Sequence, residues 1–364
     1  MKDMYPTGKS DLMTAFMLRA QRLSAPGGVW AMINLPSWMS LKSFEDLRHD
    51  FLQKQRIASM VHLGRGIFGS DFGTVAFVVD NVGPATARGI YRRLFEQHVD
   101  VRSVAAIEAL FRNSTYNRFE VAQADFAAIP GSPIVYWLSE KMRAVLAGAH
   151  KLGQISAPRQ GLSTGDNDVF VRRWWEPSQR RVLLDAASSS EVATSASRWV
   201  PYNKGGDFRK WYGNQEYLVD WESDGEAIRN LGRGAVRNEV VYFRESVSWS
   251  NVSSGEPAFR RYPRGFIGSA STGDGVFPEK QSVATYLAGI LNSSVLLALL
   301  AAVSPGLTFN VGTISRVPLP ESQPAEDLLQ TVMHTVERSK EDWDCSETSW
   351  NFACNPLVDL AARC

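Results

Sequence analysis

Cysteine is scarce in this sequence, and its placement excludes two classes of protein. The 364 residues contain three cysteines, Cys345, Cys354 and Cys364, all near the C-terminus. A secreted disulfide-stabilised domain needs a denser framework, and no histidine lies among these cysteines to complete a zinc template. We therefore expect free thiols in the reducing cytoplasm and no bound metal.

The sequence also lacks an excess of either charge and a long uninterrupted apolar run. Lys and Arg number 39 against 38 Asp and Glu, so any DNA-binding surface has to be local. The N-terminus has no apolar core of the kind found in signal peptides. The most apolar run, 283–303, is interrupted by Asn292-Ser293-Ser294. We interpret it as a buried helix and expect no membrane partner.

The apolar pattern that is present indicates α/β winding in the first part of the chain. It predicts helices over 11–24 and 44–54, a buried parallel strand over 29–34, further strands over 57–63 and 74–80, and a polar edge strand over 88–95. Alternating helices and strands with short connections are typical of a doubly wound sheet. Residues 96–150 resemble helices joined by loops, with Lys141 and Arg143 expected on an exposed helix face.

The most distinctive segment runs from Arg198 to Asn214. Its basic residues are interleaved with aromatic ones around a Gly205-Gly206 pair, which allows backbone N–H groups to approach a ligand closely. Cations can neutralise phosphates and flat side chains can stack on bases. A strand–turn–strand hairpin with ordinary aromatic packing explains the same composition, and the residues alone leave both interpretations open. The basic residues are Arg198, Lys204, Arg209 and Lys210, and the aromatic ones are Trp199, Tyr202, Phe208, Trp211 and Tyr212.

This segment resembles the recognition-domain signature of the BREX phage-defence adenine-specific DNA methyltransferases of the PglX type. Other segments resemble the same family in the same order, and agreement of several segments is far more specific than any one motif. They are Tyr5 to Leu12, His62 to Phe68, Gln160 to Arg172, Tyr217 to Trp221, Val317 to Pro320 and Asp342 to Phe352.

The resemblance implies a fold and a parent activity. Residues 1–150 would form the C-terminal half of a Rossmann-like class I methyltransferase sheet, 151–322 an α+β target-recognition domain, and 323–364 the start of a helical spacer. The boundary is expected near 150–155, where glycine and proline cluster. The intact enzyme would transfer methyl from S-adenosyl-L-methionine to adenine N6 in a specific DNA site.

The two motifs that this chemistry requires are missing from the sequence. Class I amino-methyltransferases hold the methyl donor with a glycine loop and the flipped base with an Asn-Pro-Pro-Tyr motif. Leu35-Pro36-Ser37-Trp38 is not that motif, and Gly64-Arg65-Gly66 lacks the third glycine. We therefore predict no catalytic or cofactor-binding residues, no tight binding of S-adenosyl-L-methionine, and no activity of this chain alone.

The family pattern points instead to DNA contacts. A polar turn can present free N–H groups, and asparagine can read an adenine edge, although an Asx-turn between strands explains such a turn equally well. The expected partner is double-stranded DNA, with the missing N-terminal half or other defence proteins as further candidates. A stand-alone specificity-subunit-like module that acts through a partner is the alternative function. The predicted DNA-binding residues are Thr164, Gly165, Asp166, Asn167, Lys204, Gly205, Gly206, Arg209, Lys210, Trp211, Arg237 and Asn238.

Overall fold

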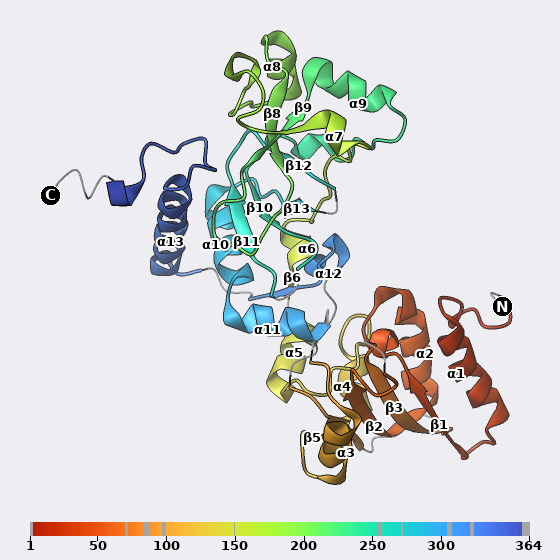
Figure 1. Ribbon diagram of the computed structural model, residues 1–364. Coiled ribbons are helices and arrows are strands. Elements are labelled where there is room, and N and C mark those ends of the chain that lie inside the picture. Colours follow the sequence, from red (N-terminus) through yellow and green to blue (C-terminus); the bar gives the residue numbers. More distant parts are fainter. Residues whose placement is uncertain are drawn as a thin grey trace. The chain divides into compact units, whose positions relative to one another are not determined.

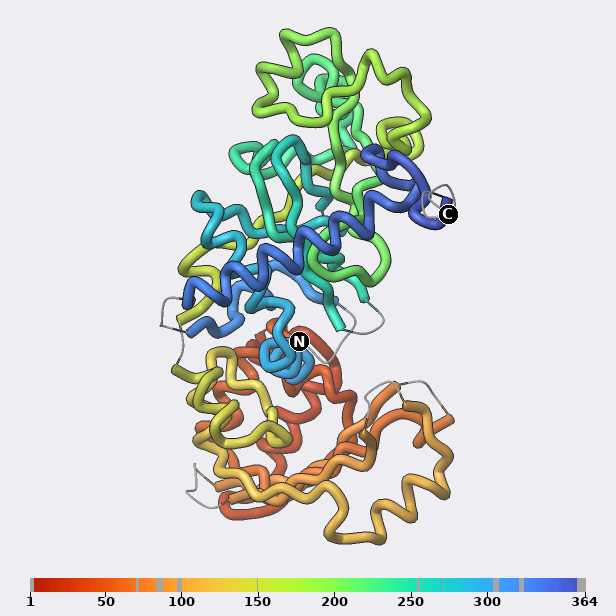
Figure 2. The backbone as a smooth tube through the Cα atoms, turned by 90° about the vertical axis from the view of Figure 1, so that its left-hand side faces the viewer, coloured from red at the N-terminus to blue at the C-terminus, as the bar shows by residue number. Residues whose placement is uncertain are grey.

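The chain folds as a mixed α/β protein (Figures 1 and 2). The computed structural model describes residues 3–69, 72–82, 88–96, 100–148, 150–253, 256–270, 272–303, 308–320 and 324–358. Two compact units are present: Met1–Ala149 with Ala302–Pro305, and His150–Ala301 with Gly306–Cys364.

The first unit is built on one five-stranded mixed sheet with the order β1-β3-β2-β4-β5. Strand β3 runs antiparallel to both β1 and β2, β4 is parallel to β2, and β5 is antiparallel to β4. Strands β1 and β2 therefore point the same way on either side of a reversed β3. The strands are β1 (Val29–Asn34), β2 (Arg56–Gly64), β3 (Thr74–Asp80), β4 (Arg88–Arg93) and β5 (Arg118–Ala122). The helices are α1 (Leu12–Leu23), α2 (Glu45–Lys54), α3 (Val104–Arg112), α4 (Gln123–Ala127) and α5 (Glu140–Gly148), with short 3-10 turns η1 (Pro36–Met39) and η2 (Lys42–Phe44).

These elements confirm the predicted helices and strands up to residue 93 and correct their placement in the sheet. β1 is an antiparallel edge strand rather than a buried parallel one. β4 lies inside the sheet, because the strand β5, which the pattern did not predict, pairs with its outer side. Arg143 is buried rather than exposed, since its guanidinium donates to Leu138 O and pairs with Asp125 at 3.1 Å.

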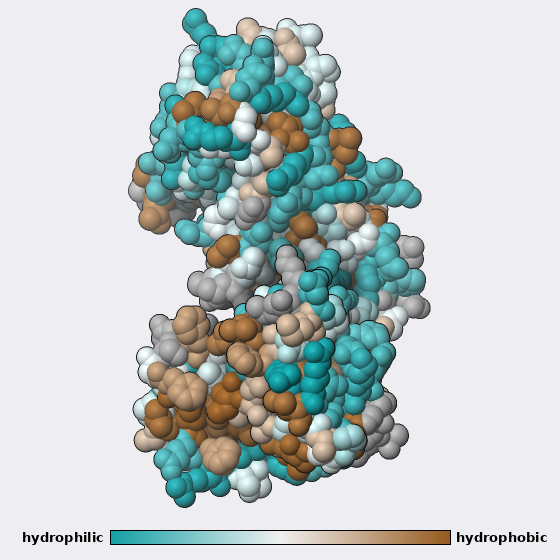
Figure 3. Space-filling view, turned by 90° about the vertical axis from the view of Figure 1, so that its right-hand side faces the viewer, coloured by the Kyte–Doolittle hydropathy of each residue, from teal (hydrophilic) through white to brown (hydrophobic). Residues whose placement is uncertain are grey.

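One side of the first unit exposes apolar side chains from α1 and β1 (Figure 3). Phe16 and Leu23 on α1 are 55% and 70% exposed, and Val29 and Ile33 on β1 are 61% and 51% exposed. Among the described residues, the outer edge of β1 has no strand partner. Exposed apolar side chains beside an unpaired strand edge are typical of a surface that another segment covers.

The described residues of the second unit form three sheets. Their orders are β12-β8-β9-β7, β11-β10-β13 and β14-β6. The strands are β6 (His150–Lys151), β7 (Val171–Arg173), β8 (Trp199–Asn203), β9 (Tyr217–Asp220), β10 (Ser246–Trp249), β11 (Phe259–Tyr262), β12 (Ile267–Gly268), β13 (Asp274–Val276) and β14 (Pro318–Leu319). The helices are α6 (Leu152–Ile155), α7 (Asn167–Phe170), α8 (Ser189–Thr194), α9 (Glu226–Asn230), α10 (Gln281–Leu291), α11 (Ser294–Val303), α12 (Val311–Ser315) and α13 (Glu326–Asp344), with 3-10 turns η3 (Gln179–Arg181), η4 (Glu222–Gly225) and η5 (Glu239–Val241).

Two separate hydrophobic cores hold this unit together. One lies around the four-stranded sheet and is centred on Tyr202, Trp221 and Ile267. The other joins the three-stranded sheet to α10, α11 and α13 through Trp249, Leu287 and neighbouring aliphatic side chains. Val332 and Val336, from the region 323–364, take part in this second core.

The apolar run 283–303 forms two helices rather than the single helix that we expected. α10 and α11 meet at an angle of 68°. Asn292 stands at the break, where its Nδ2 donates to Phe259 O and Ala288 O, both at 2.9 Å, and its Oδ1 accepts from Phe259 N at 3.1 Å. In the described part of the chain, no single helix is long and apolar enough to cross a membrane, and this bent pair meets the length and composition criteria only when its two helices are combined.

Candidate nucleic-acid interface

The central segment forms a hairpin with a long, firmly anchored loop. β8 and β9 pair antiparallel from Trp199 opposite Asp220 to Tyr202 opposite Tyr217, and residues 204–216 connect them. Hydrogen bonds attach the loop to the three-stranded sheet and the residue that follows β10. Trp211 N donates to Phe259 O at 3.0 Å, and Ser250 Oγ donates to Gly206 O at 2.8 Å. The hairpin interpretation is thus confirmed, and the question becomes which of its cations are available.

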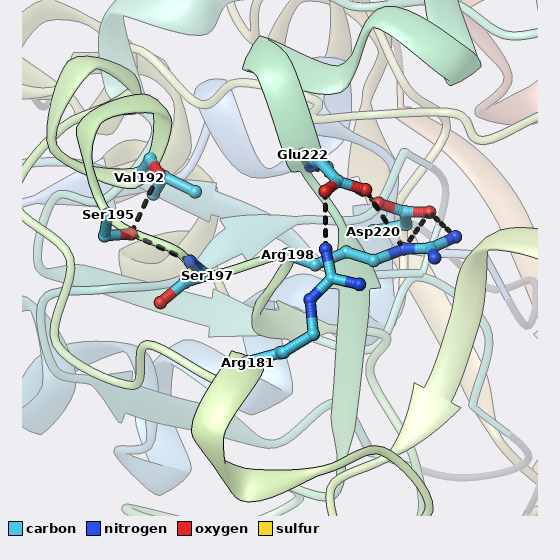
Figure 4. Close-up of polar contacts among 7 residues, drawn as sticks. All are labelled: Arg181, Val192, Ser195, Ser197, Arg198, Asp220 and Glu222. Carbon is cyan, nitrogen blue, oxygen red and sulfur yellow. Dashed lines mark hydrogen bonds and ion pairs between the residues drawn. The ribbon is translucent and has the colours of Figure 1, made fainter.

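Arg198 is a structural cation (Figure 4). Its Nε and Nη2 donate to one carboxylate oxygen of the buried Asp220 at 2.9 and 2.6 Å. This hydrogen bond, helped by the nearby Glu222, raises the pKa of the guanidinium above its ordinary value. Arg181 binds the same Glu222 at 2.5 Å. The positive charge of Arg198 is therefore already balanced by carboxylates within the fold.

Lys204 contrasts with Arg198. Its Nζ lies 5.1 Å from the centre of the Tyr217 ring, and it forms no ion pair with any described residue. Together with Asn167, Arg172 and Arg173 it lines a pocket of about 390 Å³, which the acidic residues Asp168 and Glu176 also line. The geometry therefore brings two predicted site residues from distant segments to one concave surface.

The two glycines of the Gly205-Gly206 pair lie in different surroundings, and Gly205 does not have the ligand-facing role that the sequence suggested. Gly205 is buried with φ +71°, and a Cβ there would lie 2.2 Å from Thr272 O. Its N–H donates to Asn203 Oδ1 at 3.1 Å. The close approach that requires Gly205 is thus to the protein's own backbone. Gly206, with φ +129°, is exposed and lines a smaller cleft of about 160 Å³ beside Arg260.

The later residues of the loop face α13. Arg209 pairs with Asp342 at 2.8 Å and stacks 5.1 Å from the centre of the Trp343 ring. Trp211 adopts φ +73°, and its half-buried ring packs against the core around the three-stranded sheet. Lys210 lies 5.9 Å from the Phe208 ring and forms no ion pair with a described residue. These residues form a group distinct from the Lys204 pocket.

The predicted turn at 164–167 is held from within. Asp166 caps the short helix α7 by accepting from Val169 N at 3.2 Å, and the hydroxyl of buried Thr164 donates to Asn167 Oδ1 at 2.7 Å. Asp166 is thus a helix N-cap, and the structure does not show the Asx-turn between strands that the alternative interpretation expected. Asn167 is nevertheless exposed, and its Nδ2 has no hydrogen-bond partner among the described residues.

The structure joins this turn to the predicted Arg237–Asn238 pair. Ser163 and Ala235 exchange two backbone hydrogen bonds of 2.9 and 2.8 Å, and Asn238 Nδ2 donates to Gln160 O at 2.9 Å. Arg237 is exposed beside them. The result is one surface on which exposed polar and basic groups from 160–167 and 233–238 meet.

Sequence reasoning missed two arginines on this surface. The Arg233 side chain is 71% exposed and lies 4.0 Å from Asp166, and a Cβ on Gly165 would lie 2.6 Å from the backbone N of Gly234. Arg172 lines the Lys204 pocket. No local motif identifies either arginine as a site residue. The two glycines that flank Arg233, Gly232 and Gly234, nevertheless indicate close backbone packing at this point of the sequence.

The segments of the first unit that the structure describes do not offer the residues that a methyl donor and a flipped base need. Leu35-Pro36-Ser37-Trp38 enters the 3-10 turn η1, and the Trp38 ring is 0% exposed, so it cannot stack on a base. A Cβ on Gly66 would lie 2.2 Å from Arg102 O, so that turn is closed by the protein itself. Part of the glycine-rich loop 64–73 lies outside the described residues. The residues present do not fit S-adenosyl-L-methionine, and no three His, Cys, Asp or Glu of the described chain gather as a metal site.

Comparison with known proteins places the chain. The model of the Eco57I restriction-modification methylase family matches residues 1–68. The chain is 34% identical over 372 residues to the adenine-specific methyltransferase PglX of Lacticaseibacillus casei (strain Zhang), which covers 99% of this chain and 30% of the relative. It is also 34% identical over 370 residues to the adenine-specific methyltransferase BrxX of Escherichia coli O9:H4 (strain HS), covering 98% of this chain and 29% of the relative.

Solved structures share the fold. The type ISP restriction-modification enzyme LlaGI, solved with a DNA substrate mimic, aligns over 93% of this chain and 38% of its own, with a TM-score of 0.52 and 9% identity. The type IIL enzyme MmeI, solved in complex with DNA, aligns over 95% of this chain and 46% of its own, with a TM-score of 0.51 and 12% identity. The chain spans about 30% of the length of its curated relatives. Over nearly its whole length, the chain is similar to part of the adenine-specific methyltransferases PglX and BrxX.

Proposed function

We propose that this chain is the part of a BREX-type, S-adenosyl-L-methionine-dependent adenine-N6 DNA methyltransferase that carries target recognition. The observation that carries the proposal is the 34% identity over 99% of the chain to a protein named as an adenine-specific methyltransferase. The partner would be double-stranded DNA, and the setting a cytoplasmic phage-defence system. The missing donor loop and amine-binding motif would lie elsewhere in the enzyme.

The proposal assigns a role to each unit. Residues 1–150 would be the later part of a class I methyltransferase sheet, 151–322 the recognition domain, and 323–364 the beginning of a spacer. The unpaired edge of β1 and the exposed apolar side chains of α1 support the first assignment, because further strands of a larger sheet would cover them. A polypeptide carrying the two missing motifs should copurify with this chain, and Ile33→Lys should abolish the copurification. Equal recovery of the variant would refute this assignment.

Recognition would use the surface around the 164–167 turn. Asn167 presents an Nδ2 without a partner among the described residues, beside Lys204, which forms no ion pair with a described residue. An amide can read an adenine edge, whereas a lysine holds a phosphate as a point charge, so the pair could combine sequence reading with backbone attachment. Arg237 and Asn238 would extend the same surface. Arg209, Lys210 and Trp211 remain proposed contacts on a separate face.

A stand-alone recognition module is the second candidate. The observation in its favour is that the second unit has two hydrophobic cores of its own. A unit with its own core can fold and bind without the catalytic half. Such a module would bind a specific DNA site and act through a partner protein.

The test is equilibrium binding of the full 364-residue chain to duplex DNA over a series of salt concentrations with excess nonspecific competitor. The proposal predicts retained binding whose affinity falls steeply with salt, because neutralised phosphates release counterions. Enrichment of one sequence from a random library would then show specificity. Soluble, folded protein that binds no duplex at low salt would refute a recognition role for this chain.

A further inference from the structure

A second concave surface of the second unit lies outside all the predicted site residues. It is a cleft of about 520 Å³ lined by three segments far apart in the sequence: 155–159, 240–244 and 277–283. The residues following α6 and those of η5 form two walls, and the N-terminal end of α10 forms the third. We refer to it as the basic cleft.

Three cations line the basic cleft without an acidic partner. Arg159, Arg244 and Lys280 form no ion pair with any described residue. Arg244 donates to Phe277 O at 3.1 Å, which fixes its guanidinium on the wall. One acid, Glu279, lines the same space, so the formal charge of the lining is three minus one, or +2. Other arginines of this unit are paired with carboxylates: Arg173, Arg181, Arg198, Arg229 and Arg261.

The end of α10 adds to the positive potential. This 11-residue helix begins at Gln281 after the N-cap Lys280, which makes no side-chain cap, and its first turn carries no acid. The N-terminus of a helix has a partial positive charge and N–H groups that favour an anion. Here that end faces a space that already holds three unbalanced cations. Like charges gathered in this way repel one another, and an anionic ligand would relieve the repulsion.

Apolar side chains make up most of the remaining lining of the cleft. Val240 is 83% exposed and Ile155 is 49% exposed, and Phe277 and Val283 are also among the lining residues. A free phosphate or sulfate ion would leave these side chains in water. A sugar–phosphate backbone would instead place its phosphates at the cations and its sugar carbons against the aliphatic side chains.

The basic cleft adjoins the proposed recognition surface through covalent and hydrogen-bonded neighbours. Arg159 directly precedes Gln160, whose carbonyl accepts from Asn238 Nδ2 at 2.9 Å. Asn238 lies two residues before Val240 in the opposite wall. One duplex could therefore contact both surfaces.

We propose that the basic cleft binds the phosphodiester backbone of the DNA duplex whose bases the 164–167 turn reads. This inference rests on the proposed function and adds to it the site that holds the strand in register. Because it contacts phosphates, the cleft would strengthen binding to all sequences about equally and would carry no base preference.

The experiment compares the wild-type chain with Arg159→Gln/Arg244→Gln/Lys280→Gln in the same salt series on specific and unrelated duplexes. The matched control, Arg180→Gln/Arg264→Gln/Lys141→Gln, removes the same charge from exposed residues outside the cleft. Arg159→Gln/Lys280→Gln changes exposed residues alone and guards against misfolding of the triple variant. With about 0.9 log units of salt slope for each phosphate contact, the triple variant should lose a slope of about 2 to 3 and bind about tenfold or more weakly, equally on both duplexes.

The outcomes separate this inference from the proposed function. If the wild type binds DNA and the cleft variant binds with the same affinity and salt slope as the control variant, the proposed role of the cleft is refuted. The proposed function is then unaffected. Failure of the wild type to bind any duplex refutes both. ATP binding that the cleft variant loses, with DNA binding unchanged, assigns the cleft to a free nucleotide and overturns the backbone assignment.

Discussion

Lys204 and Arg198 lie six residues apart in one hairpin, yet the structure predicts opposite consequences of removing their charges. Lys204→Gln removes a cation that forms no ion pair with a described residue and that contacts the face of Tyr217. An exposed cation–π contact contributes about 0.5–1 kcal/mol, so the stability should change by no more than that. One lost phosphate contact should reduce the salt slope of DNA binding by about 0.9.

Arg198→Gln should do the reverse. It leaves the carboxylate of Asp220, whose side chain is 5% exposed, without the guanidinium that donates two hydrogen bonds to one of its oxygens. Removing one partner of a buried ion pair costs about 3–5 kcal/mol, and the 38% exposure of Arg198 lowers the expected cost to about 2–3 kcal/mol. The salt slope of DNA binding by the folded protein should not change.

The two variants are compared by denaturant unfolding and by DNA titration at several salt concentrations. The structure predicts that Lys204→Gln lowers the salt slope of DNA binding with little loss of stability. It predicts that Arg198→Gln lowers the stability and leaves the salt slope unchanged. If both variants lost the same slope at equal stability, the distinction between free and balanced cations would be wrong.

Three further predictions concern other contacts of the second unit. Asn292→Ala should cost about 2 kcal/mol in denaturant unfolding, because it leaves the buried N–H of a β11 residue without its side-chain acceptor. The Arg229 guanidinium donates to Glu239 and holds the pKa of that carboxyl below its ordinary value of 4.5, so the pair stabilises the fold above that pH and its contribution is lost as the pH falls through the lowered pKa. Glu239→Gln should therefore flatten the decline of unfolding free energy below about pH 5, and an unchanged decline would contradict it. Asp342→Asn should free Arg209 and steepen the salt slope of DNA binding by up to about 0.9, whereas an unchanged slope would remove Arg209 from the proposed interface.

The hydrophobic pattern predicted the elements of the first unit up to residue 93, but it predicted neither β5 nor the neighbours of each strand in the sheet. Strand β4 has the alternation of an edge strand, and only its pairing with β5 places it inside. Strand β1 is apolar on both faces, as a buried strand would be, yet its outer edge has no partner among the described residues. A strand's own residues encode its burial and cannot specify which segment pairs with it.

The sequence indicated which segments contribute to the candidate site. It did not indicate which of their basic residues are free of an acidic partner. Arg209 and its partner Asp342 are separated by 133 residues, and no local pattern joins them. The basic cleft is likewise assembled from three distant segments, each with a single cation that looks like ordinary surface charge. Pairing by tertiary contacts decides whether a basic residue is free to bind an anion.

The central claim is that the second unit carries the DNA-contacting surface. Hydrogen exchange of the full chain, measured with and without duplex DNA, tests it most directly, since bound DNA protects the amides that it covers. The account predicts new protection in 160–168, 203–206 and 233–244 and around the N-terminus of α10. Protection confined to the first unit, or no protection at saturating DNA, would contradict it.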